Sequence, residues 1–255
     1  MFMRRRPLPL ICLVGVLSAA GALVSAPAFA GKDGLLEPSL KLAGRGTGAP
    51  RVALTFDACM GAADQRILST LIDNRIPATI FVTARWLKRN GDVLAVLRAH
   101  PDLFELENHG AMHVPAVDKP VAIYGIPAAG SPEAVAAEVN GGGGAILAAG
   151  APAPHWFRGA TAKYTASSIA QIRSLGYEVA GYSLNGDDGS LLGARAAAHR
   201  ISAARDGDVI IAHINQPSHA AGEGVAEGIL ALKARGFTFL RLDEAREQGS
   251  HATVN

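Results

Sequence analysis

Short apolar runs alternate with amphipathic stretches along most of the chain. Patterns typical of helices lie around residues 68–72 and at 86–97, 166–175, 192–205 and 223–235. Between them lie runs typical of β-strands, at residues 51–56, 78–82, 104–106, 155–157, 179–184, 208–212 and 237–240. Strands interleaved with helices indicate a parallel sheet with helical crossovers. We therefore expect an α/β fold of about seven parallel strands in a single domain.

Residue types that perform chemistry follow the ends of these runs. Each of six such residues comes just after a strand-like run: Asp57, His109, His113, Arg158, Asp188 and His213. In an α/β barrel the loops after the strands converge on one face and build the active site there. This placement favours a distorted or incomplete (β/α) barrel over an open sheet, and it indicates an enzyme.

One helical pattern contains four consecutive glycines. Residues 131–149 begin with Ser131-Pro132-Glu133, a helix cap with proline in the first turn, and then reach Gly141-Gly142-Gly143-Gly144. Each glycine inside a helix costs about 1 kcal/mol relative to alanine. Either the helix breaks at this run or packing elsewhere compensates for the cost.

The first thirty residues have the composition of an export signal. Arg4, Arg5 and Arg6 precede a long uncharged stretch that ends in Ala28-Phe29-Ala30, a typical cleavage pattern. We expect a signal peptide and export to the periplasm or the cell exterior. The alternative is an uncleaved anchor, because the uncharged stretch is long enough to span a membrane. Its Pro, Gly, Ala and Ser content favours removal, after which we expect no membrane attachment.

The rest of the chain is predicted to contain one folded unit. Residues 31–49 are glycine-rich and weakly patterned, which is typical of a linker or of a strand that covers the bottom of the barrel. The predicted organisation is a signal peptide, a linker, a catalytic domain and a C-terminal tail, at residues 1–30, 31–49, 50–247 and 248–255.

The charge balance gives no indication of nucleic-acid binding, which needs a clustered basic surface. The chain has 24 basic and 22 acidic side chains. Three arginines and no acid lie in the first thirty residues, so cleavage leaves 21 basic against 22 acidic side chains. Cleavage also removes Cys12 and leaves Cys59 without a partner for an internal disulfide.

Two histidines have the spacing of metal ligands. His109 and His113 are four residues apart, which places both imidazoles on one side of a helical turn and suits a single metal ion. The alternative is two unrelated histidines in a chain that has eight. Asp57 ends an apolar strand, where a carboxylate is costly unless it binds a metal, pairs or transfers protons. The alternative for Asp57 is a helix cap, a role that fits Asp64 better.

Two further pairs suggest proton chemistry. His213 follows one apolar run and Asp188 follows another. Asp188 can orient His213 and raise its pKa, so that this histidine donates a proton. Arg158 can pair with Asp57 and keep it ionised. The alternatives are a structural histidine and an ordinary ion pair.

Together these segments resemble the motifs of polysaccharide deacetylases of the NodB-homology type, carbohydrate esterase family 4. VALTFDACMG at residues 52–61 resembles the first motif, T-F-D-D-G after a strand, and residues 107–113 resemble N-H-S/T-x-x-H. Phe157-Arg158 resembles the start of the arginine motif. The second strand and the fourth and fifth motifs correspond to residues 76–82, 182–188 and 208–213. The resemblance covers about residues 50–243.

The resemblance implies an amide hydrolase that uses one divalent metal ion, with zinc as the expected metal, and removes N-acetyl groups from a polysaccharide. It acts on carbon–nitrogen bonds other than peptide bonds. The resemblance assigns each role as follows: Asp57 as general base, His109 and His113 as metal ligands, Arg158 as the residue that orients Asp57, and His213, assisted by Asp188, as the proton donor to the leaving amine. It also implies a backbone N–H near Tyr164 as an oxyanion donor.

The chain departs from the family pattern at its metal site, with TFDAC in place of TFDD. The second Asp of the motif, a metal ligand in the family, is Ala58. We rank Asp57 first as the replacement ligand, because a carboxylate with two imidazoles is a common open zinc site. The Cys59 thiolate is second, on the expectation that the strand turns it away from Asp57. A weak or absent metal is the third possibility. If Asp57 binds the metal, Glu107 and Asp64 are the reserve bases.

Other departures concern the substrate. The arginine motif reads as a longer loop, residues 158–164, and Gly189 replaces the tryptophan of the fourth motif. Two alternative functions therefore stay open. Ala58 and Gly189 favour a non-catalytic carbohydrate-binding relative. An aromatic content of only 5% favours a hydrolase of a non-glycan amide, because sugar-binding grooves usually offer aromatic faces.

Overall fold

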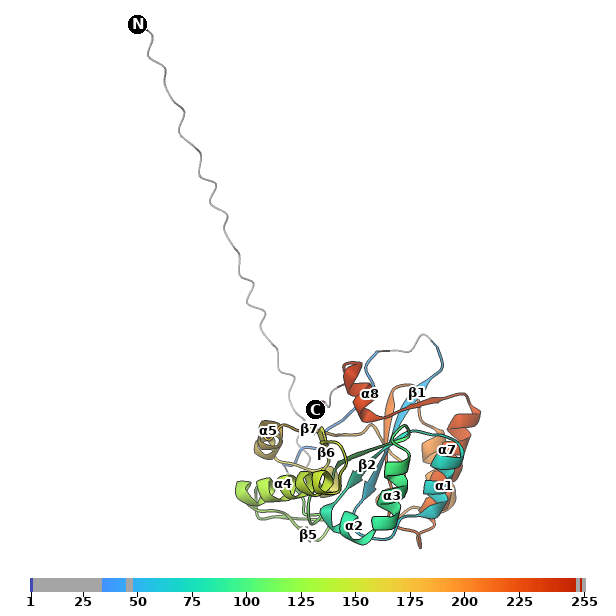
Figure 1. Cartoon of the computed structure of the whole chain (residues 1–255), viewed down its shortest axis with the longest axis horizontal. Helices are drawn as coiled ribbons and strands as arrows, with labels where there is room; N and C mark the ends of the chain where they lie inside the picture. The colour runs from blue at the N-terminus through green and yellow to red at the C-terminus, as the bar shows by residue number, and fades with distance from the viewer. Residues whose placement is uncertain (2–33, 45–47, 251–252, 254–255) are drawn as a thin grey trace.

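The computed structural model describes Met1 and residues 34–44, 48–250 and 253. Apart from Met1, the predicted signal peptide lies outside these described residues. Parallel strands form a curled half-barrel with helices packed around it (Figure 1). Among the described residues, none of the helices combines the length and apolarity needed to cross a membrane.

The central sheet has eight strands, all paired in parallel. Seven of them follow the order β7-β6-β3-β2-β1-β9-β8, and β10 pairs with the first residues of β1. Their bounds are β1 (Arg51–Ala58), β2 (Ala78–Val82), β3 (Phe104–Asn108), β6 (Trp156–Phe157), β7 (Glu178–Val179), β8 (Leu184–Asn185), β9 (Asp208–His213) and β10 (Thr238–Leu240). β7 and β8 are not paired with each other within the described residues. The predicted incomplete barrel is therefore confirmed.

The run at residues 179–184 forms two short strands instead of the single predicted strand. The break has a physical cause in the N-terminal segment. A Cβ atom on Gly181 would lie 2.1 Å from the carbonyl oxygen of Pro38, so only glycine allows this approach. The backbone N–H of Leu40 donates to the Tyr182 carbonyl at 3.4 Å. The N-terminal segment thus contacts the chain between the end of β7 and the start of β8.

The described part of the predicted linker packs onto the barrel. Leu36, Leu40 and Leu42 are buried. Leu40 and Leu42 join the inner core cluster of the barrel with Trp156. Residues 34–43 therefore act as a cover of the half-barrel rather than as a detached linker.

The helices lie outside the sheet, and side-chain caps fix where several of them begin. Asp64, Thr83, Ser131 and Thr165 each accept a hydrogen bond from a backbone N–H of the first turn that follows. The helices are α1 (Gln65–Asp73), α2 (Ala84–Arg89), α3 (Gly91–Ala99), α4 (Pro132–Ala148), α5 (Ala166–Ser174), α6 (Ala194–Ser202), α7 (Ala221–Ala234) and α8 (Leu242–Glu247), with a short hairpin of β4 (Ala122–Ile123) and β5 (Ile126–Pro127) and a 3-10 turn η1 (Ala160–Ala162).

Alternation along β1 separates an outer from an inner face. Val52, Leu54 and Phe56 pack in the outer cluster with the helices. Ala53 packs in the inner cluster with Phe81 and Trp156. Because side chains two residues apart share a face of a strand, Thr55 and Asp57 also point inward. The large apolar residues of β1 therefore build the outer core, and its polar residues line the barrel.

Helix α4 continues through all four glycines, so packing compensates for their cost. A Cβ atom on Gly142 would lie 2.1 Å from Asn108 Oδ1, and one on Gly143 would lie 2.0 Å from the Tyr177 hydroxyl. Asn108 Nδ2 in turn donates to the Val139 carbonyl of α4 at 2.8 Å. The glycines let the helix axis lie directly against the end of β3, where the two candidate metal-binding histidines begin.

Candidate metal and catalytic site

Most of the predicted site residues meet at the carboxyl end of the barrel. Asp57 on β1 lies opposite His213 on β9 in the sheet register. Asn108 on β3 lies opposite Phe157 on β6, so His109 and Arg158 follow neighbouring strand ends. The geometry thus brings residues from four distant segments to one place.

His109 is buried and presents one ring nitrogen to the site. Its Nδ1 donates to the Arg158 carbonyl oxygen at 2.5 Å. This bond fixes the tautomer and leaves the Nε2 lone pair available, as is usual for a metal-binding histidine. Nε2 lies 3.5 Å from Cys59 Sγ and 3.7 Å from Asp57 Oδ2. Burial lowers the pKa of His109, which favours the neutral ring that binds metals.

His113 occupies a tight loop that a buried acid holds in place. Its φ is +63°, in the left-handed region that side chains other than glycine rarely adopt. On either side, the N–H groups of Met112 and Val114 donate to the Glu138 carboxylate at 3.0 Å. Burial and the neighbouring His109 imidazole lower the pKa of His113 to about 3. The loop therefore keeps a neutral imidazole next to that of His109, with 5.2 Å between the ring centroids.

Cys59, His109 and His113 form a group of suitable size for a metal ion. Their ligand atoms lie within 4.8 Å of one another, and Asp57 belongs to no such group among the described residues. One thiol and two imidazoles are a donor set that binds zinc-like ions, so the residues present fit the implied metal. The expectation that Cys59 points away from Asp57 is wrong. Cys59 Sγ and Asp57 Oδ2 lie 3.5 and 3.7 Å from the same atom, His109 Nε2, whereas Ala58 packs in the outer cluster. This is expected for residues two apart in an extended chain.

Asp57 is paired with Arg158 as predicted. Arg158 is fully buried, and its Nη1 donates to Asp57 Oδ1 at 3.0 Å and to Thr55 Oγ1 at 2.9 Å. Its Nη2 donates to the Gly181 carbonyl at 3.0 Å, and the guanidinium lies over the Phe81 ring. Burial raises the pKa of Asp57, but the neighbouring His109, Arg158 and His213, together with the hydrogen bond from Arg158, outweigh it and hold the pKa below its ordinary value.

The partner of His213 is Asp187, not the predicted Asp188. Asp187 is fully buried and accepts from both the backbone N–H of His213, at 2.6 Å, and its Nδ1, at 3.0 Å. Burial lowers the pKa of His213, but the hydrogen bond and the charge of Asp187 outweigh it and raise the pKa. Asp188 is exposed in a turn, with φ +55°, and its N–H donates to Asn185 Oδ1. The turn sends the two adjacent acids in different directions.

Asp64, Glu107 and Tyr164 have other partners. Asp64 caps α1 and pairs with Arg66. Glu107 accepts the Trp156 N–H at 2.7 Å inside the barrel. The N–H of Tyr164 donates to the Leu36 carbonyl at 2.9 Å. Asp64 and Glu107 therefore have structural roles, and the N–H of Tyr164 itself is not an available oxyanion donor.

Sequence reasoning missed Asp187 and Glu138. For Glu138 a signal existed, because it lies between Val135 and Gly142 on the buried stripe of α4, where an acid is unexpected. For Asp187 the motif offered two adjacent acids, and the resemblance assigned the role to the second, Asp188.

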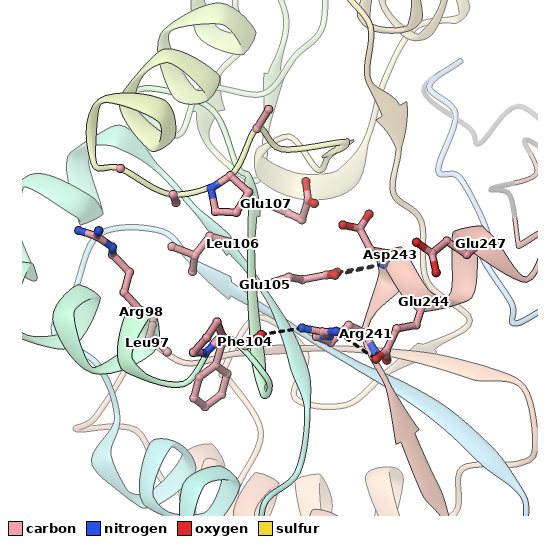
Figure 2. Close-up of a pocket in the computed structure, with 15 residues that line it drawn as sticks. Leu97, Arg98, Phe104, Glu105, Leu106, Glu107, Arg241, Asp243, Glu244 and Glu247 are labelled. Carbon is pink, nitrogen blue, oxygen red and sulfur yellow. Dashed lines mark hydrogen bonds and ion pairs between the residues drawn. The ribbon is translucent and has the colours of Figure 1, made fainter.

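A cavity of about 480 Å³ lies at the other end of the barrel, by the start of β3. Figure 2 shows Glu105 and Glu107 of β3 facing Asp243 of α8 across it. Glu105 accepts the N–H groups of Leu242 and Asp243 at 2.8 and 3.1 Å, which ties α8 to the barrel. Burial raises the pKa of Glu105 to about 7 and that of Glu107 as well.

Comparisons with known proteins identify a matching family and solved structures with a similar fold. The sequence model of the family described as Polysaccharide deacetylase matches residues 44–180. No curated protein sequence matches the chain. Among similar solved structures, a CE4 family pseudoenzyme from Bacillus anthracis has 18% identity and a TM-score of 0.63 over 78% of this chain and 66% of its own. The chain thus spans about two thirds of that protein's length.

Two further structures match over most of their own length. The peptidoglycan deacetylase PdaC from Bacillus subtilis has 18% identity and a TM-score of 0.63, over 79% of this chain and 92% of its own. A family 4 acetyl xylan esterase from Clostridium thermocellum, in complex with a cobalt ion, has 24% identity and a TM-score of 0.61, over 77% and 90%. At these identities the structures show a shared fold.

Proposed function

The chain belongs to the polysaccharide deacetylase family, and from this premise we propose that it is an exported, metal-dependent hydrolase that removes N-acetyl groups from an envelope or extracellular polysaccharide. Export is inferred from residues 1–30, and the acetylated carbohydrate from the family. The observation that carries the proposal is the meeting of three units at one end of the barrel. These are the Cys59, His109 and His113 donor group, the Asp57–Arg158 pair and the His213–Asp187 pair.

A divalent ion would be held by His109 and His113 together with a third side chain at the end of β1. When bound, such an ion polarises an acetamide carbonyl and lowers the pKa of a water molecule. The protein prepares this chemistry by keeping both imidazoles neutral and by fixing the His109 ring through its hydrogen bond to the Arg158 carbonyl.

Asp57 is the proposed general base. Its pKa lies below the ordinary value, so it is ionised at neutral pH and can accept a proton from the attacking water. Arg158 holds Oδ1 by a hydrogen bond and leaves Oδ2 for that role. Arg158 thus acts as a positioning residue through Asp57.

His213 is the proposed acid. Because Asp187 raises its pKa, His213 carries a proton at a higher pH than an ordinary histidine does. Its Nδ1 is engaged by Asp187, which leaves Nε2 to donate to the amine nitrogen as the carbon–nitrogen bond breaks. The acetyl group leaves as acetate, and the sugar keeps the protonated nitrogen as a free amine.

Two other functions have support from specific residues. Ala58, together with the similarity to a CE4 pseudoenzyme, favours a non-catalytic carbohydrate-binding protein. Gly189 lies in open space with no side chain to stack on a sugar, and Leu191 close to it is exposed. These two positions favour an amide without a sugar as substrate.

The test is acetate release by the purified protein from N-acetylated glycan strands, from chitin oligosaccharides and from a panel of simple amides. We expect release from a glycan, loss with a chelator, recovery with zinc, and a loss of about 100-fold or more in His213→Ala. Release that persists in metal-free protein would exclude the metal mechanism. Glycan binding that survives His213→Ala, with no acetate released by either form, would favour the binding protein. Product from non-sugar amides alone would favour the third function.

A further inference from the structure

We propose that the Cys59 thiolate is the third protein ligand of the metal site and that Asp57 stays outside the coordination shell. This inference rests on the proposed function only in assuming that a metal binds His109 and His113. Its consequence is chemical, because a thiolate selects zinc-like ions over magnesium and manganese, which prefer carboxylate oxygens.

The separation of the donors agrees with a tetrahedral site. Bonds of about 2.3 Å to sulfur and about 2.05 Å to imidazole nitrogen, at a tetrahedral angle of about 109°, place the two donor atoms about 3.5 Å apart. Cys59 Sγ lies 3.5 Å from His109 Nε2. All three donor atoms, including that of His113, lie within 4.8 Å of one another. Three protein ligands leave one position for water or substrate, as in catalytic zinc sites.

The backbone holds Cys59 in this position. Its carbonyl accepts a hydrogen bond from Thr83 Oγ1 at 2.6 Å, and Thr83 also caps α2 through the Trp86 N–H. The Cys59 side chain is 7% exposed, so it faces the interior of the site rather than solvent. The chain therefore anchors this residue from β1 and α2 together.

Asp57 is less suited to be the ligand. Its Oδ2 lies 3.7 Å from His109 Nε2, yet it belongs to no group of three donors among the described residues. Its Oδ1 is bound to Arg158, whose positive charge opposes a second cation on the same carboxylate. The carboxylate is thus free to serve as the base.

The experiment is a cobalt titration of the full-length, metal-free protein, followed by its absorption spectrum. Thiolate ligation gives a charge-transfer band in the near ultraviolet, which carboxylate and imidazole ligands do not give. The variants are Cys59→Ala, Cys59→Ser and Asp57→Asn, with Cys12→Ser as the matched control for the other cysteine of the chain.

We expect the band at one cobalt per chain in the wild type, Cys12→Ser and Asp57→Asn. We expect Cys59→Ala and Cys59→Ser to lose the band and to bind cobalt at least about tenfold more weakly, since loss of an outer-shell partner alone costs about 10–100-fold. Should both Cys59 variants fail to fold, a band that persists in Cys12→Ser still assigns the thiolate to Cys59, because the chain has only these two cysteines.

If the wild type binds cobalt without producing the band, and Asp57→Asn loses that binding, the inference is overturned and Asp57 is the ligand. The proposed hydrolase would still stand in that case. A wild-type protein that binds neither cobalt nor zinc would overturn both this inference and the metal mechanism of the proposed function.

Discussion

Asp187 receives two hydrogen bonds from His213, one from the backbone N–H at 2.6 Å and one from Nδ1 at 3.0 Å. The first bond fixes the carboxylate against β9, and the second orients the imidazole. The neighbouring Asp188 makes neither contact and lies exposed in a turn. The two side chains are chemically identical, and the backbone conformation at each residue decides which of them reaches His213.

Asp187→Asn is expected to lower kcat for acetate release by about 100-fold, a typical contribution of general acid catalysis. The amide keeps the shape of the side chain but loses the charge that raises the pKa of His213. The measurement is steady-state kinetics on an N-acetylated oligosaccharide. The adjacent Asp188→Asn is the matched control, with kcat expected to change by no more than a few-fold. Equal effects of the two substitutions would contradict the assignment.

The rate should also depend on pH in a way that Asp187 controls. Asp57 is ionised above its lowered pKa, and His213 is protonated below its raised pKa, so both are in the reactive state between these values. We expect the upper limb of the profile, where kcat falls as His213 loses its proton, to lie above the ordinary histidine pKa of about 6.5. In Asp187→Asn this upper limb should move to lower pH, while Asp188→Asn leaves it in place. Profiles of kcat against pH for the wild type and both variants test this. If the upper limb lies at the same pH in Asp187→Asn as in the wild type, His213 is not the acid.

The fold could be predicted from local pattern, except where distant segments meet. The run that became β1 has apolar side chains at alternate positions, Val52, Leu54 and Phe56, which is typical of a strand with one face on the core. The run at 179–184 looks equally strand-like, but the approach of the Pro38 carbonyl to Gly181 divides it into β7 and β8. A contact between segments so far apart in sequence leaves no local signal.

The site shows the same limit. The motifs predicted which segments meet, because ligands at strand ends of a parallel sheet converge. They favoured Asp188 over Asp187, and this was wrong because the chain turns at Asp188, where φ is +55°. The expectation that Cys59 turns away from Asp57 was wrong, because residues two apart in an extended chain share a face, and both side chains lie near His109 Nε2.

Stability should fall as pH rises through a window set by Glu105. Burial raises the pKa of Glu105 from 4.5 to about 7. Between these values the folded state binds a proton that the unfolded chain has lost, so stability decreases with rising pH, by at most about 1.4 kcal/mol per unit. Glu105→Gln removes this titration and keeps an oxygen for the N–H groups of α8.

Urea unfolding between pH 4.5 and 7.5 tests the window. We expect a flatter dependence of the free energy of unfolding on pH in Glu105→Gln. Some slope should persist, because the pKa of buried Glu107 is raised too. Glu227→Gln, at an exposed position on α7, is the control and should follow the wild type. A slope unchanged by Glu105→Gln would contradict the role given to this residue.

Two glycines of α4 should respond to alanine in opposite ways. Gly144 has no atom within 4 Å of its missing Cβ, so Gly144→Ala should stabilise the helix by up to about 1 kcal/mol. At Gly142 the added carbon would lie 2.1 Å from Asn108 Oδ1 and 2.7 Å from the Gly110 carbonyl carbon. Gly142→Ala should therefore destabilise the protein by about 1–3 kcal/mol, the usual effect of overpacking.

Gly142 also connects the helix to the candidate metal site. Asn108 Oδ1 accepts the N–H of Gly110 at 2.8 Å, and these two residues flank His109. Pushing them away from α4 should displace the His109 ring, so Gly142→Ala is expected to weaken zinc binding by about tenfold or more, like the loss of an outer-shell partner. Gly144→Ala should leave zinc affinity unchanged. Calorimetric zinc titration of both variants, with thermal unfolding as the measure of stability, separates the effects. If Gly142→Ala unfolds at lower temperature yet binds zinc as the wild type does, the glycines serve helix packing alone, and α4 does not position the histidine.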